Sequence, residues 1–87
     1  MKARLKDGFE AEIIEENVGD WEFLEILSDI DEGETGLIVK AARKMLGRDG
    51  VDRLKNHLRK EDGRVDITEM VEAFNELLTS VNELKNS

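Results

Sequence analysis

Residues 2–13 read KARLKDGFEAEI, in which small or apolar side chains alternate with charged ones on both sides of a central Asp-Gly pair. Ala3 and Leu5 share one face before this pair, and Phe9, Ala11 and Ile13 share one face after it. Alternation with period two around Asp-Gly favours a β-hairpin, because Asp-Gly suits the two-residue type I′ turn. A lone hairpin is marginally stable in water, so we expect its apolar face to pack against helices.

After the hairpin the apolar residues recur with helical spacing, and the first such segment spans about 16–31. Gly19 lies inside this segment and makes the start of the helix ambiguous. A shorter helix that begins at Trp21, with Asp20 as its N-cap, is the alternative.

Two further helices are predicted at about 35–46 and 50–60. Thr35 is the expected N-cap of the first, and Gly47 is the expected residue just after its end, where glycine often adopts a left-handed conformation.

The segment at about 67–84 has the most regular pattern in the chain. Its apolar residues are spaced alternately three and four apart, as in a heptad repeat: Ile67, Met70, Phe74, Leu77, Val81 and Leu84. In one interpretation the whole stripe completes the monomer core. In the other, the C-terminal part of the helix extends beyond the core, and Leu78, Val81 and Leu84 bind a partner or a second copy of the chain.

These segments predict one α+β domain over residues 1–87, mainly α, with the N-terminal hairpin packed on a bundle of about four helices. A chain of 87 residues has room for one small core. We expect five residues to lie at its centre: Trp21, Leu24, Leu27, Phe74 and Leu77.

Residues 59–70, RKEDGRVDITEM, resemble the second half of an EF-hand calcium loop if Glu69 occupies position 12. That register places Leu58 and Lys60 at positions 1 and 3, where calcium requires oxygen ligands. We therefore expect no metal site. The Asp-Gly pair predicts a turn instead, followed by a new helix with Asp66 in a capping box.

The sequence offers no recognisable catalytic constellation. It has no Cys and a single histidine, His57, which has no thiol to pair with and is interpreted as structural or exposed. No serine lies in a Gly-x-Ser-x-Gly elbow, and no glycine-rich phosphate loop is present. We expect a protein that is not an enzyme and uses no cofactor.

Charge is distributed in blocks. The net charge is −8, yet residues 7–34 contain twelve acidic and no basic residues, whereas residues 35–64 contain nine basic and four acidic residues. Either the two blocks neutralise each other in the fold, or the acidic block is a docking surface for a basic partner.

The basic segment 40–64 also suggests an alternative function, that of a small helix-turn-helix-like regulator that binds nucleic acid. The net negative charge opposes attraction to DNA and to anionic lipid, so we expect neither partner. No stretch is long and apolar enough to predict a membrane-spanning segment.

Three stretches carry a resemblance to a known family: Lys6-Asp7-Gly8-Phe9, Asp20-Trp21-Glu22 and residues 59–65, RKEDGRV. Over about residues 4–78 the chain resembles small acidic proteins from the tail gene cluster of long-tailed phages and prophages of Gram-positive bacteria. Several of these are regarded as tail assembly chaperones. The resemblance implies a cytoplasmic protein of the bacterial host that binds and solubilises the tape measure protein and presents it to the tail tube protein.

Overall fold

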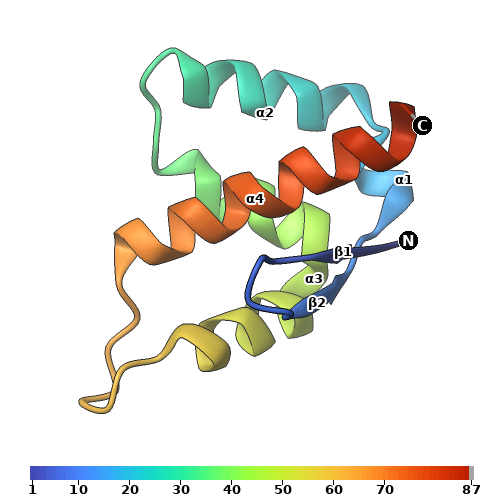
Figure 1. Cartoon of the computed structure of the whole chain (residues 1–87). Coiled ribbons are helices and arrows are strands. Elements are labelled where there is room, and N and C mark those ends of the chain that lie inside the picture. Colours follow the sequence, from blue (N-terminus) through green and yellow to red (C-terminus); the bar gives the residue numbers. More distant parts are fainter. Residues whose placement is uncertain (87) are drawn as a thin grey trace.

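The structure, a computed structural model, describes the backbone of residues 1–86 and the side chains of residues 1–83. Over this range the chain forms two strands and four helices (Figure 1). They follow in the order β1 (Lys2–Arg4), β2 (Glu10–Glu12), α1 (Glu15–Val18), α2 (Trp21–Asp31), α3 (Leu37–Leu58) and α4 (Ile67–Asn86). The predicted α+β class, mainly α, is confirmed.

The two strands pair antiparallel, as the alternating pattern predicts, with Ala3 opposite Ala11 at the centre. Both alanines are buried, whereas the flanking charged residues point outward, so the hairpin has one apolar and one charged face. On the charged face, Arg4 Nη2 lies 2.7 Å from Glu10 Oε2. The strand β1 packs against α4, and the Lys6 N–H donates to Glu76 Oε1 at 3.1 Å.

The hairpin turn differs from the predicted type I′. The Leu5 N–H donates to the Phe9 carbonyl at 2.9 Å, and the Gly8 N–H donates to the Leu5 carbonyl at 3.0 Å, which defines a three-residue loop. Type I′ requires positive φ at both central residues, and among the described residues only glycines, including Gly8 at 98°, have it. The Asp7 carboxylate instead accepts from the Phe9 N–H at 3.0 Å.

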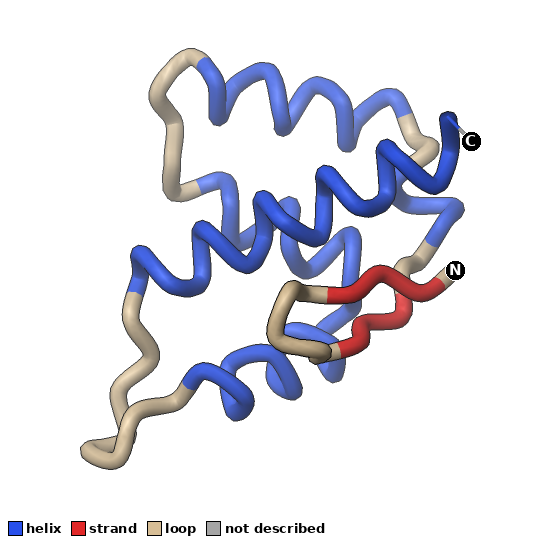
Figure 2. The backbone as a smooth tube through the Cα atoms, in the orientation of Figure 1, coloured by secondary structure: helices blue, strands red, loops and turns tan. Residues whose placement is uncertain are grey.

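The same loop recurs between α3 and α4, in the tan connector of Figure 2. The Lys60 N–H donates to the Arg64 carbonyl, the Gly63 N–H donates to the Lys60 carbonyl, and the Arg64 N–H donates to the Asp62 carboxylate. The predicted turn is confirmed, since Asp62-Gly63, like Asp7-Gly8, closes a loop through an Asp side chain and a left-handed glycine.

Asp66 caps α4, because its carboxylate accepts the Glu69 N–H at 3.0 Å. The other half of the predicted capping box, a bond from the Glu69 side chain back to Asp66, is replaced by an ion pair between Glu69 and Lys60. Lys60 thereby ties the connector to the first turn of α4.

The predicted helix at 16–31 is two helices, α1 and α2, and the alternative with Asp20 as N-cap is confirmed. The Asp20 carboxylate accepts the Glu22 N–H at 3.2 Å. The inner face of α2 buries Phe23 and Ile26. Helix α2 therefore begins directly after its N-cap, Asp20. The residues that it turns toward the core differ from the predicted ones.

The predicted core positions Trp21 and Leu24 are wrong, since their side chains are 71% and 55% exposed. Residues spaced strictly three apart step around a helix, because each step of three falls about 60° short of a full turn. Trp21 therefore lies opposite Ile30 on the helix. Phe23, Ile26 and Ile30 stay within about 60° of one another and form the inner face.

The prediction of two helices at about 35–46 and 50–60, with Gly47 just after the end of the first, is confirmed: α3 consists of two helices that meet at a kink at Gly47, where φ is 75° and ψ is 165°. The predicted N-cap Thr35 is wrong. Gly36 occupies the cap position without a side-chain bond, and Thr35 contributes only its carbonyl, which accepts the Ile38 N–H at 3.0 Å.

Helix α1 packs against α3 just before the kink. The Ile14 N–H donates to the Met45 carbonyl at 2.9 Å, and Asn17 Nδ2 donates to the Lys44 carbonyl at 2.9 Å. These carbonyls belong to the last turn before Gly47, where a helix end leaves acceptors without helical partners. The kink is thus stabilised by the segment that leads into α2.

Gly47→Ala is expected to lower the free energy of unfolding by about 1 to 3 kcal/mol, because its backbone conformation is essentially restricted to glycine. A Cβ at this position would also lie 3.3 Å from Ile14 Cδ1. Gly36→Ala is the matched control: φ is −60° and no described atom would lie within 4 Å of the new Cβ. Urea unfolding should show no loss of stability for the control. Equal losses for both variants would contradict this account of the kink.

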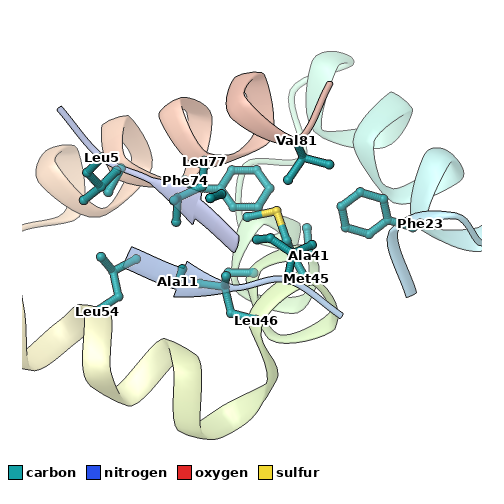
Figure 3. Packing of buried hydrophobic residues seen from close by; sticks show 14 of the residues in the cluster. Leu5, Ala11, Phe23, Ala41, Met45, Leu46, Leu54, Phe74, Leu77 and Val81 are labelled. Carbon is teal, nitrogen blue, oxygen red and sulfur yellow. The ribbon is translucent and has the colours of Figure 1, made fainter. Parts of the chain in front are cut away.

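The core is one cluster between α4, α3, α2 and the hairpin (Figure 3). Phe74 and Leu77 are buried in it, as predicted, and Met45 lies beside them at the centre. Leu27 is half-buried and packs against the cluster. The fully or nearly fully buried members are Ala3, Leu5, Ala11, Ile13, Phe23, Ile26, Ala41, Ala42, Met45, Leu46, Leu54, Ala73, Phe74, Leu77 and Val81.

Candidate partner-binding surface

Two of the three residues of the predicted partner seam on α4 do not form an exposed apolar surface. Val81 is 1% exposed and belongs to the core, and Leu78 is half-buried against it. The side chain of Leu84 lies outside the described residues. Helix α4 packs against both β1 and α3, so its apolar stripe is covered within the chain at least as far as Val81.

Large apolar side chains are exposed in three places among the described residues. Trp21 and Leu24 lie one turn apart on α2, whereas Val39 on α3 and Ile67 on α4 are isolated. Helix α2 lies along the upper edge of the molecule in Figure 1. Trp21 and Leu24 therefore form an apolar pair on an outer helix.

Around this pair lies a shallow hollow of about 320 Å³ lined by Trp21, Leu24, Glu25, Ser28 and Asp29, a set that we call the α2 face. The five residues follow the spacing of one helix face. The α2 face combines the largest apolar side chain in the chain with two carboxylates and a hydroxyl group.

The carboxylates of the α2 face have no ion pair with a described basic side chain. Lys40 and Lys44 of α3 line a neighbouring groove with Glu25 and Asp29, but no described lysine nitrogen lies within 4.0 Å of either carboxylate. At this groove the acidic and basic blocks therefore lie side by side without a direct ion pair.

Much of the basic segment 40–64 is engaged within the chain. Lys55 pairs with Asp52, Lys60 pairs with Glu69, and Arg64 pairs with Asp62. The segment up to residue 58 consists of two helices that meet at Gly47, the one residue of α3 with non-helical φ and ψ. A junction of one residue is shorter than the three- or four-residue turn of a helix-turn-helix motif.

The side chain of His57, on α3, contacts the hairpin turn. Its Nε2 lies 2.7 Å from Asp7 Oδ2, and its ring centroid lies 4.6 Å from that of Phe9. Arg53 lies over the ring of Phe9, with its guanidinium carbon 5.4 Å from the centre of that ring. The hydrogen bond from His57 lowers the pKa of Asp7 below its ordinary value. His57 thus has a structural partner, as one of the two sequence interpretations anticipated.

A second hollow, of about 610 Å³, lies between β1 and α4. Its lining is mainly polar and carries both signs of charge: Arg4, Lys6, Glu72, Asn75, Glu76, Thr79, Ser80 and Glu83. Within the described residues no group of three His, Asp or Glu side chains is placed to hold a metal ion. None of the described helices has the length and apolar character needed to cross a bilayer.

Comparison of the chain with protein-family models, curated proteins and solved structures yields no match. The choice of candidate surface therefore rests on the geometry of the chain itself. A helical-wheel reading of α2 would have identified the α2 face from the sequence, because it separates Trp21 from Phe23 and Ile26.

Proposed function

We propose that this protein is a non-enzymatic protein-binding module that acts as a phage tail assembly chaperone. In this role it binds the tape measure protein in the cytoplasm of the bacterial host, keeps it soluble and presents it to the tail tube protein. The resemblance of residues 4–78 to small acidic tail-cluster proteins supplies the identity of the partner. The α2 face is the surface that we propose for binding this partner.

The observation that carries the proposal is the exposure of Trp21 beside Leu24. Tryptophan is enriched among the residues that dominate binding energy in protein interfaces, since it buries a large apolar area and loses little conformational entropy. A tryptophan that is 71% exposed on a helix, next to an exposed leucine, is therefore suited to anchor a partner.

The charge of the chain suits a solubilising role. With a net charge of −8 over 87 residues, the protein repels other copies of itself and of its own complexes. A partner whose apolar surface is covered by such a module would be less prone to aggregate.

The test is co-expression of the chain with fragments of the tape measure protein and with the tail tube protein, followed by affinity capture and light scattering. We expect a stoichiometric complex with a helical tape measure fragment. Recovery of the folded chain without any tail protein, at concentrations well above micromolar, would contradict the proposal.

A further inference from the structure

The α2 face is asymmetric about Trp21. Leu24 lies on one flank, next to the half-buried Leu27, and Glu25 and Asp29 lie on the other flank. Along the helix axis an apolar edge and an acidic edge therefore run side by side, and Lys40 and Lys44 of α3 line the groove beyond the acidic edge. A ligand that covers both edges needs an apolar strip and, alongside it, a row of positive charge.

We infer that the α2 face binds an amphipathic helix whose apolar stripe is bordered on one side by lysine or arginine, an inference that rests on the proposed protein-binding function. The apolar stripe covers Trp21 and Leu24. The basic row meets Glu25 and Asp29, whose carboxylates lack an ion-pair partner among the described side chains. This deepens the proposed function, because it defines the chemistry of the segment that the chaperone recognises.

A second copy of the chain fits this surface poorly. Each copy carries a net charge of −8, so two copies repel each other. In the block 35–64, which holds nine basic residues, the one large apolar side chain that is exposed within the described residues is Val39, which is too little to cover both Trp21 and Leu24. Charge complementarity therefore favours a helix of another protein that has basic residues along one edge.

The experiment uses two synthetic peptides of about 18 residues, or five helical turns, with identical leucine stripes. One peptide has lysine and the other has glutamate at the positions bordering the stripe, and neither contains tryptophan. Trp21 is the only tryptophan of the protein, so its fluorescence reports directly on the α2 face. We expect the lysine peptide to shift the emission to shorter wavelength and to bind at least about tenfold more tightly than the glutamate peptide.

The matched protein variants are Glu25→Lys/Asp29→Lys and Glu61→Lys/Glu72→Lys, which change the net charge equally. The first pair lies on the α2 face, whereas Glu61 and Glu72 are exposed on the α3–α4 connector and on α4. We expect the first variant to lose about tenfold in affinity for the lysine peptide, together with most of the salt dependence of binding. The second variant should retain both.

Each outcome separates this inference from the proposed function. If a tape measure fragment binds the wild type and Glu25→Lys/Asp29→Lys equally well, the basic-helix inference is wrong while the chaperone function stands. If the lysine peptide binds as described but no tail protein does, the inference holds and the chaperone function is wrong. A wild-type dimer that Glu25→Lys/Asp29→Lys dissociates would overturn the inference in favour of a second copy.

Discussion

Phe74→Ala is expected to lower the melting temperature by roughly 15 to 30 °C, enough to leave much of the protein unfolded at physiological temperature. Phe74 is 3% exposed and lies where α4 meets Met45 of α3 (Figure 3). Truncation of a buried phenylalanine costs about 3 to 5 kcal/mol, which approaches the whole stability of a domain of this size. Thermal unfolding followed by circular dichroism at 222 nm measures the effect.

Leu24→Ala is the control for Phe74→Ala, because both residues are predicted from the sequence to lie in the core. Leu24 is 55% exposed, so its truncation should shift the melting temperature by only a few degrees. A loss of stability at Leu24 equal to that at Phe74 would mean that α2 packs through its other face.

Trp21→Ala is expected to weaken binding of the tail partner about 30- to 1000-fold, the range that corresponds to about 2 to 4 kcal/mol for an interface hot spot. The variant should keep its melting temperature, since the Trp21 side chain is mostly exposed and contributes little to the core. Isothermal titration calorimetry with the captured tape measure fragment, together with thermal unfolding, measures both quantities.

Ile67→Ala is the matched control for Trp21→Ala. Ile67 is also a large, exposed apolar residue, but it lies at the start of α4, away from the α2 face. Its truncation should leave the dissociation constant within about twofold of wild type. Unchanged binding by Trp21→Ala, or an equal loss with Ile67→Ala, would remove the α2 face as the docking surface.

The sequence predicts the elements of this fold because their patterns are local. Alternation around Asp7-Gly8 identifies the hairpin, and Gly47 marks the break in the helical pattern. The exact turn type is missed because Asp-Gly suits more than one hairpin loop, and here the Asp7 carboxylate selects the three-residue loop by accepting the Phe9 N–H.

The candidate site is harder to predict than the elements. Whether Val81 is a seam or a core residue depends on how far β1 and α3 extend along α4, which is a tertiary property. The core prediction for Trp21 and Leu24 is wrong for a local reason, because residues spaced three apart do not stay on one face of a helix. The inner face of α2 can therefore be predicted from the helical periodicity of its sequence. The burial of the apolar stripe of α4 follows only from the assembled fold.

The contact between the hairpin and α4 also constrains how the protein matures on the ribosome. Strand β1 is synthesised before α4, yet its Lys6 N–H finds Glu76 as acceptor 70 residues later. A two-stranded hairpin alone is only marginally stable, and it packs against α3 as well as α4, so the nascent N-terminal strands are fully covered only after both helices have left the exit tunnel. Protection of the first residues therefore depends on helices that are synthesised after them, in a protein whose proposed task is to protect another.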